Sequence, residues 1–367
     1  IDEFHLDGLR LDATQNIHDD SPEHILAAVS GRVREAARGR ATILLAENEP
    51  QHTRLVRPLD RGGYGLDAIW NDDFHHSAMV ALTGRNEAYY GDHLGTPQEL
   101  ISVIKWGFLY QGQWYSWQRQ RRGTPTVGLG PAAFVIFIQN HDQVANSLHG
   151  RRVHALASPG RYRAMTALLL LAPGTPLLFQ GQEFAASSPF LFFADLKELA
   201  PEMRRGRATF LAQFPSLAGV ETEASLADPT DPRTFGRSKL DLGERERHAE
   251  AYALHRDLLR LRHEDPVFSA QRPGGVDGAV LGPDVFVLRF FGEAHGDRLL
   301  LVNLGRDWRA EPAPEPLLAP PAGARWALLW SSEAPRYGGS GVAALDPDGA
   351  WVIPGHAAIV LIPRVGG

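Results

Sequence analysis

The first 270 residues alternate short apolar runs with amphipathic segments. The apolar runs predict strands at 8–13, 41–49, 65–74, 132–142 and 175–184. Apolar residues recur at helical spacing between these runs, which predicts helices at 21–39, 76–82, 161–171 and 244–268. Strands that are nearly all apolar are expected where helices cover both faces of a parallel sheet.

The helix that follows the first strand has clear end signals. Ser21 is a good N-cap, and Pro22 fits the first helical position. Gly39 predicts the C-terminal end of the helix. The apolar residues between these ends lie on one helical face: Ile25, Val29 and Val33.

The pattern changes after about residue 272. Short apolar strands are separated there by Gly, Pro and Asp, which predicts an antiparallel β-sandwich domain over 271–367. The β/α alternation of 1–270 suits a (β/α)8 TIM barrel or a doubly wound sheet, and the absent glycine fingerprint of dinucleotide binding favours the barrel. Two long segments, at about 85–130 and 185–240, are expected to be loops over the binding face.

Every predicted strand ends in polar residues, and barrel enzymes place their chemistry at the carboxyl ends of the strands. Three of these ends supply a carboxylate, from Asp12, Glu47 and Asp142. Glycoside hydrolysis needs two carboxyl groups that flank one bond. Arg10 shares a strand face with Asp12, so its guanidinium should keep Asp12 ionised. Burial behind an apolar run should raise the pKa of Glu47, as a proton donor requires.

Competing readings exist for these residues and their neighbours. A lone carboxylate at a strand end is usually a cap or a salt-bridge partner. Glu49 competes with Glu47 for the role of proton donor, because the two residues share a strand face. A metal site is not predicted at 70–76, because adjacent His75 and His76 should diverge. The remaining candidates either bind sugar or have structural roles: Asp72, Asp73, Gln182, Glu183, Trp106, Trp114, Tyr115 and Trp117.

Composition narrows the class of protein. The chain has 367 residues, of which 37 are basic and 43 acidic, and no basic stripe indicates a nucleic-acid partner. No apolar run reaches about 18 residues, so no membrane span is expected. The absence of cysteine excludes disulfides and thiolate metal sites, and it fits a cytoplasmic protein.

Three short motifs resemble the α-amylase family of glycoside hydrolases: "DGLRLDA", "LLAENE" and "FIQNHDQ". Longer segments, such as "WNDDFHHSAMVALTG" and "FQGQEFAASSPFLFFADL", resemble the members of that family that release trehalose. The resemblance covers essentially all of 1–267. It implies a retaining hydrolase that cleaves the α-1,4 bond next to the terminal α,α-trehalose of maltooligosyl trehalose. That substrate and related α-glucans would be its partners, and no cofactor is implied.

The same resemblance implies individual roles. Asp12 would be the nucleophile, Glu47 the proton donor because it directly follows Ala46, and Asp142 the group that stabilises the distorted sugar ring. Arg10 would position Asp12, and His141 would hydrogen-bond the sugar. Two further residues of the fourth motif, Asn140 and Gln143, are expected to bind substrate.

The resemblance also raises an expectation about the barrel. The first family motif has no counterpart here, and the predicted strands correspond to strands four to eight. We therefore expect the chain to be the C-terminal part of a longer protein, whose N-terminal portion completes the barrel.

The alternatives to the trehalose-releasing function are a glycogen branching enzyme or another α-1,4-glucan hydrolase or transferase. A non-catalytic glucan-binding barrel is a further alternative, although all three carboxylates are present.

Overall fold

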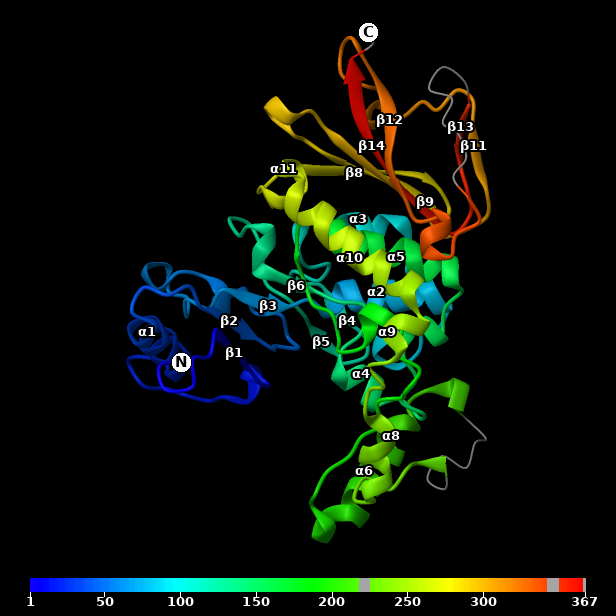
Figure 1. The fold of residues 1–367 in the computed structure, drawn as a ribbon. Helices are drawn as coiled ribbons and strands as arrows, with labels where there is room; N and C mark the ends of the chain where they lie inside the picture. Colours follow the sequence, from blue (N-terminus) through cyan, green and yellow to red (C-terminus); the bar gives the residue numbers. More distant parts are fainter. Residues whose placement is uncertain (218–224, 342–349, 366–367) are drawn as a thin grey trace.

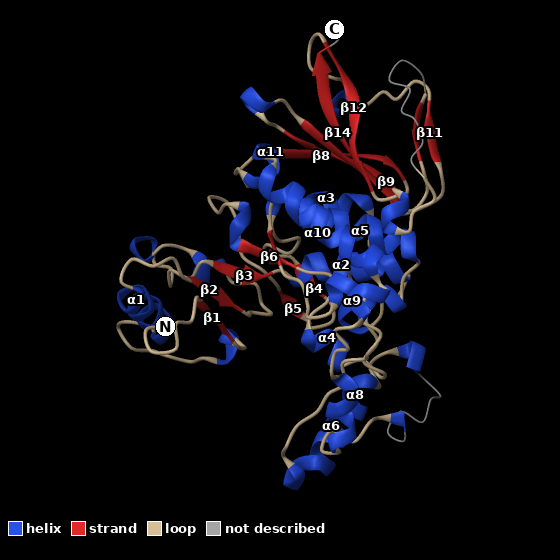
Figure 2. Ribbon diagram, viewed as in Figure 1, coloured by secondary structure: helices blue, strands red, loops and turns tan. Residues whose placement is uncertain are grey.

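The computed structural model describes residues 1–217, 225–341 and 350–365. Its strands form a parallel sheet near the N-terminus and antiparallel sheets near the C-terminus, with most of the helices between and below them (Figures 1 and 2). The strands are β1 (Gly8–Leu11), β2 (Ile43–Ala46), β3 (Ala68–Trp70), β4 (Trp114–Tyr115), β5 (Gln120–Arg121), β6 (Phe134–Ile136), β7 (Thr175–Pro176), β8 (Val276–Gly282), β9 (Val285–Phe290), β10 (Arg298–Asn303), β11 (Trp308–Ala310), β12 (Ala324–Ser331), β13 (Trp351–Ile353) and β14 (Ala357–Val365).

The helices alternate with the parallel strands and fill the inserts. They are α1 (Ile25–Ala37), α2 (Asp72–Thr83), α3 (Pro97–Trp106), α4 (His141–Ala145), α5 (Pro159–Leu171), α6 (Ala200–Leu211), α8 (Pro232–Ser238), α9 (Glu244–Arg247), α10 (Ala249–Glu264) and α11 (Pro266–Ser269). None of the helices in the described ranges is long and apolar enough to cross a bilayer.

The parallel sheet has the strand order β1-β2-β3-β6-β7, with every neighbouring pair parallel. The alternating apolar runs therefore predict it correctly. Strands β1 and β2 approach each other closely at Gly8, where an added Cβ atom would lie 2.0 Å from the carbonyl oxygen of Ile43. Parallel strands end at the same edge of a sheet, so the polar residues after β1, β2, β3 and β6 share one rim.

The start of α1 differs from its prediction. The helix begins at Ile25, and His24 is its N-cap, with its ring nitrogen accepting from the Leu26 N–H. The carboxylate of Asp19 accepts from the backbone N–H groups of Ser21 and Ile25. This polar turn satisfies the free N–H groups before the helix, so Ser21 does not cap it.

The long helix expected at 244–268 is broken into α9, α10 and α11. The last break has a clear cause, because Asp265 adopts an extended conformation before Pro266 and caps α11. The two segments expected to be loops also contain helices, α3 in the first and α6 and α8 in the second. Residues 218–224 of the second segment lie outside the described residues, and its helices extend away from the rest of the molecule (Figure 1).

The C-terminal strands form a five-stranded antiparallel sheet of order β12-β14-β10-β9-β8 and a two-stranded sheet of β11 and β13. The two sheets share an apolar cluster that includes Trp326 and Ile353. A second cluster runs without interruption from α5 and α10 into β10 and β14. Ion pairs add to this contact, between Arg163 and Glu333 and between Arg298 and Asp265.

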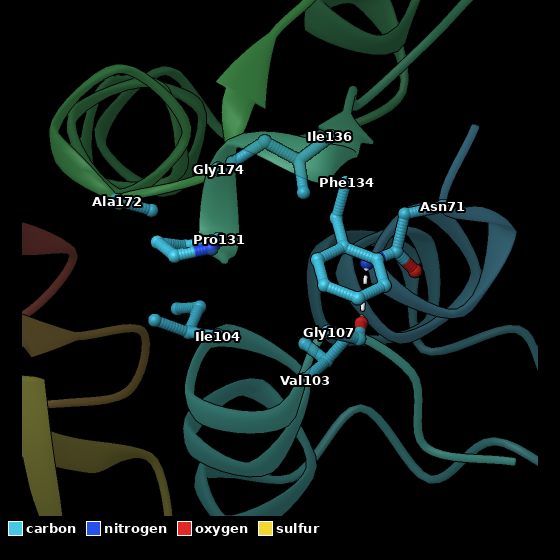
Figure 3. A pocket seen from close by; sticks show the side chains of 9 residues that line it. All are labelled: Asn71, Val103, Ile104, Gly107, Pro131, Phe134, Ile136, Ala172 and Gly174. Atoms are coloured by element: carbon cyan, nitrogen blue, oxygen red, sulfur yellow. Dashed lines mark hydrogen bonds between the residues drawn. The ribbon is translucent and has the colours of Figure 1, made fainter. Parts of the chain in front are cut away.

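A small apolar pocket of about 10 Å³ lies beside β6 (Figure 3). Phe134 and Ile136 of β6 face Ile104 of α3 across it. Asn71 borders the pocket and donates through its side-chain amide to the carbonyl oxygen of Gly107. The volume is no larger than one water molecule needs, so this pocket is a packing feature and does not bind substrate.

Candidate active site

The candidate site lies at the rim formed by the carboxyl ends of the parallel strands. Asp12 follows β1 and Glu47 follows β2, and the backbone hydrogen bond from Glu47 N to Leu11 O keeps the two strand ends in register. The Thr14 hydroxyl donates to the carbonyl oxygen of Glu47 at 2.7 Å, which fixes the turn after β1 against the end of β2. The two carboxyl groups are therefore presented by rigid backbone.

Arg10 joins these two carboxyl groups. Its Nη1 bonds to Asp12 and its Nη2 bonds to Glu47. The Asp12 side chain is 76% exposed and that of Glu47 is 22% exposed, so one carboxyl group faces solvent and the other is largely covered. One guanidinium thus holds both groups in contact at the open face of the sheet.

The two carboxyl groups differ in their pKa. A hydrogen bond from Glu47 and the charge of Arg10 lower the pKa of Asp12 below its usual value. Burial and the interaction with Asp12 raise the pKa of Glu47, and the nearby charge of Asp142 raises it further. Asp12 therefore ionises more readily than Glu47, and glycosidases use a separation in this direction between nucleophile and proton donor.

Helix α4 carries the fourth motif. Asn140 is its N-cap, since its side-chain oxygen accepts from the N–H groups of Asp142 and Gln143. This bonding gives the Asn140 side-chain oxygen a structural role, and its Nδ2 has no partner among the described residues. His141 and Asp142 are partly exposed, and their side chains approach to 3.3 Å, so both remain available to a ligand.

A buried arginine from the first insert reaches the same rim. The Arg122 side chain has no exposed surface, and three carboxylates surround it: Asp72 and Asp73 at 3.5 Å and Glu49 at 3.7 Å. Its Nε donates to the carbonyl oxygen of Glu49 at 3.1 Å. Three carboxylates therefore share one buried cation.

The two adjacent aspartates of α2 respond oppositely to this environment. Burial raises the pKa of Asp72 to about 7, against the opposing charge of Arg122. Burial also opposes ionisation of Asp73, but Arg122 and His93 outweigh it and lower its pKa. Asp73 additionally accepts from the N–H groups of Leu109 and Tyr110, which makes it a buried anchor for the first insert and not the sugar ligand that was expected.

The expectation that His75 and His76 diverge is wrong. Both side chains are buried, and their Nδ1 atoms lie 3.1 Å apart. Burial lowers the pKa of His75 to about 3 and that of His76 well below its usual value, so both stay neutral. Neither caps the helix, because Asn71 accepts from the Phe74 N–H there. No group of three or more His, Asp or Glu residues in the described ranges could hold a metal ion.

Gln182 and Glu183 follow β7 and were expected either to bind sugar or to have structural roles. Gln182 is fully buried and accepts from the Gln139 side chain at 3.3 Å, so it anchors a loop. Glu183 lies 3.9 Å from Arg245 of α9. The backbone at Gln182–Phe184 is a short 3-10 turn, so the strand expected at 175–184 is limited to Thr175–Pro176.

The aromatic residues that were candidates for sugar stacking differ in burial and in their contacts. Tyr115 is buried and its hydroxyl donates to the carbonyl oxygen of Tyr89, whereas the neighbouring Trp114 is exposed. Trp117 donates to the side chain of Gln213 at 3.1 Å and thereby ties the first insert to the second. Trp106 is exposed beside Lys105, which forms an ion pair with β8 of the C-terminal sheet, and so lies away from the rim.

Sequence reasoning missed Trp70 and Arg207 in addition to Arg122. Trp70 is the last residue of β3, and its ring lies against Arg10. Arg207 of α6 donates to the Ala145 carbonyl oxygen at 3.0 Å and to the Asn146 side chain at 3.2 Å, which secures the end of α4. Trp70 ends an apolar strand, which is a usable signal in the sequence. The contacts of Arg122 and Arg207 depend on how the inserts fold, so the sequence gives no such signal for them.

The chain is similar to several known proteins. Malto-oligosyltrehalose trehalohydrolases from Deinococcus radiodurans and Arthrobacter ramosus are 42% and 38% identical, over 84% and 76% of this chain. A solved Salmonella typhimurium protein assigned as an α-amylase has a TM-score of 0.80 and 33% identity, and the match covers 98% of this chain and 57% of that one. A family model described as a domain of unknown function (DUF3459) matches residues 273–360.

The chain belongs to the α-amylase family of glycoside hydrolases. The resemblance of the three short motifs is thereby confirmed. The matches cover 50% and 48% of the two curated relatives, so the chain spans about half their length.

Proposed function

We propose that the protein is a retaining glycoside hydrolase that cleaves the α-1,4 bond next to the terminal trehalose of maltooligosyl trehalose. The observation that carries this proposal is the bridge from Arg10 to both Asp12 and Glu47, two carboxyl groups whose pKa values shift in opposite directions. Retaining enzymes need this pairing of an ionised nucleophile with a protonated acid.

In the first step, a carboxylate oxygen of Asp12 attacks the anomeric carbon, and the bond from that carbon to the leaving oxygen breaks. Glu47 gives its proton to that oxygen, which departs as a hydroxyl group of trehalose. In the second step, the Glu47 carboxylate takes a proton from water as the water attacks the anomeric carbon. The ester to Asp12 then breaks, and both residues return to their starting states.

Asp142 and His141 would hold the sugar ring during these steps. Both side chains are partly exposed at the start of α4, and Asp142 acts electrostatically on Glu47. A carboxylate near the ring favours the positive charge that develops in the transition state. Gln143 follows in the first turn of α4, and Asp72 and Glu49 lie near Glu47 at the adjoining part of the rim. These residues are candidates for contacts with further hydroxyl groups.

The five observed parallel strands can be assigned to particular strands of a barrel. We assign residues 1–270 to a (β/α)8 barrel, in which β1, β2, β3, β6 and β7 correspond to strands four to eight. Residues 271–367 form the C-terminal all-β domain in this assignment. The parallel strand order and the coverage of the Salmonella structure support it.

The substrate assignment is supported by the names of the curated relatives and is tested by a matched pair of substrates. The full-length protein is given maltooligosyl trehalose and, separately, a maltooligosaccharide with the same number of glucose units. Faster cleavage of the first, with trehalose as the product, is expected. Equal rates would contradict the trehalose specificity, transfer products would indicate a branching enzyme or another transferase, and binding without turnover would indicate a non-catalytic barrel.

A further inference from the structure

We propose that Trp70 is a positioning residue, which holds the Arg10 guanidinium between Asp12 and Glu47 and links it to the His141–Asp142 pair. This inference rests on the proposed function, because it assigns a part in the same reaction to a residue outside the three motifs. Trp70 acts through Arg10 and His141 and not by contact with the reacting atoms.

The position of Trp70 in the sheet suits this role. It is the last residue of β3, the central strand of the five, so its side chain stands between the ends of β2 and β6. Its relative exposure is only 6%. A large rigid ring at the middle of the rim therefore separates the β1–β2 part of the site from the α4 part.

One face of the ring supports Arg10. The Cζ atom of the guanidinium lies 4.5 Å from the centre of the Trp70 ring, well within the distance for a cation–π contact. Arg10 is largely covered, and such contacts strengthen when the cation is shielded from water. The planar guanidinium can stack on the ring and still direct both terminal nitrogens outward, to Asp12 and to Glu47.

The ring also contacts the other half of the site. His141 lies edge-on to Trp70, with ring centres 6.1 Å apart, and Phe137 packs against it at 5.6 Å. The indole N–H is buried and has no hydrogen-bond partner within the described part of the chain. Since a buried N–H without a partner is costly, packing alone does not account well for a tryptophan at this position.

Loss of the ring should therefore act on catalysis through Arg10. A guanidinium without its aromatic support would lose its fixed position between two carboxylates that compete for it. Its charge lowers the pKa of both, so displacement should raise both. Five charged or titratable groups surround this point. Arg10 lies in β1, Asp12 follows β1, Glu47 follows β2, and His141 and Asp142 begin α4.

The test compares Trp70→Leu with Trp70→Phe in the full-length protein. We expect Trp70→Leu to lower kcat by roughly tenfold, the size of effect that one shielded cation–π contact can produce. KM should stay within about twofold, because the ring does not touch substrate. Both limbs of the pH profile of kcat/KM should move to higher pH, and Trp70→Phe should restore most of the rate and the profile. Unchanged kcat and limbs in a folded Trp70→Leu protein would overturn the inference.

A second readout does not depend on turnover. Subtracting the fluorescence of Trp70→Phe from that of the wild type isolates the emission of Trp70, which should change as neighbouring groups titrate. We expect that change to be altered by Asp12→Asn. A pH-independent difference spectrum would overturn the link between Trp70 and the site. If the wild type does not cleave maltooligosyl trehalose but this titration is present, the proposed function fails and the positioning role stands.

Discussion

Replacement of Asp72 by asparagine tests whether burial raises the pKa of this residue at the rim. Burial raises its pKa from 3.8 to about 7, and Arg122 at 3.5 Å does not compensate fully. The Asp72 side chain is only 17% exposed, so solvent screens this effect weakly. Asparagine has nearly the same shape as a protonated aspartate and cannot ionise, so the variant isolates the titration.

The size and sign of the effect follow from proton linkage. Between about pH 4 and pH 7 the folded protein holds a proton on Asp72 that the unfolded chain has released, so this residue makes stability fall as pH rises. A shift of about three pKa units corresponds to about 4 kcal/mol. Relative to the wild type, Asp72→Asn should therefore gain stability through this window and reach a constant difference above about pH 7.

The neighbouring Asp73 provides the matched control. Its pKa is lowered, so its contribution to stability is present above the unfolded value of about 4 and is lost as pH falls through the folded value. Asp73→Asn should destabilise the protein at neutral pH by roughly 3–5 kcal/mol, as expected when one partner of a buried ion pair is removed. The deficit should shrink in acid. Two adjacent Asp→Asn changes thus have opposite effects.

The assay is denaturant unfolding of the full-length wild type and both variants, at a series of pH values from about 2 to 8, so that it covers the titration of both aspartates. A difference between Asp72→Asn and the wild type that does not change with pH would refute the raised pKa. A difference that falls as pH rises would show that Arg122 dominates burial at Asp72. Either result would also weaken the account of three carboxylates sharing one cation.

Three other predictions concern residues that support the rim. Asn71→Ala removes both the cap of α2 and the bond to the Gly107 carbonyl, and it should lower the free energy of unfolding by about 2–4 kcal/mol in denaturant titrations. Arg207→Gln loosens the end of α4 and should lower kcat severalfold in steady-state assays, while Arg207→Lys retains more activity. Arg122→Met leaves buried carboxylates unpaired, so thermal melts should show marked destabilisation that acid partly relieves.

The sequence predicted the parallel sheet well because its signal is local. The apolar run at 134–138 is buried throughout, as expected for a strand covered on both faces. Strand β2 differs, because Leu44 and Ala46 are buried while Ile43 is 42% exposed. Ends of elements were harder to predict. Ser21 and Pro22 have the residue types of a helix start, but Asp19 and His24 satisfy the first N–H groups of α1. Competition among nearby polar groups decides such boundaries, and periodicity does not report it.

Within the site, residues carried by the strands were predictable and residues carried by the inserts were not. Arg10 and Asp12 share a strand face, so their contact follows from alternation. Arg122 reaches its carboxylates only because the hairpin of β4 and β5 folds back on the rim. Helix α3 was missed although Thr96 and Pro97 mark its start, because the aromatic and glycine content of that segment suggested a loop.

The central claim is that Glu47 is the proton donor of a trehalose-releasing hydrolase. The most direct test measures initial release of trehalose from maltooligosyl trehalose by the full-length wild type, Glu47→Gln and Glu49→Gln. The account predicts a loss on the order of a thousandfold for Glu47→Gln, as for removal of a general acid, and a loss within about tenfold for Glu49→Gln. Substantial trehalose release by Glu47→Gln, or the reverse order of the two variants, would contradict it.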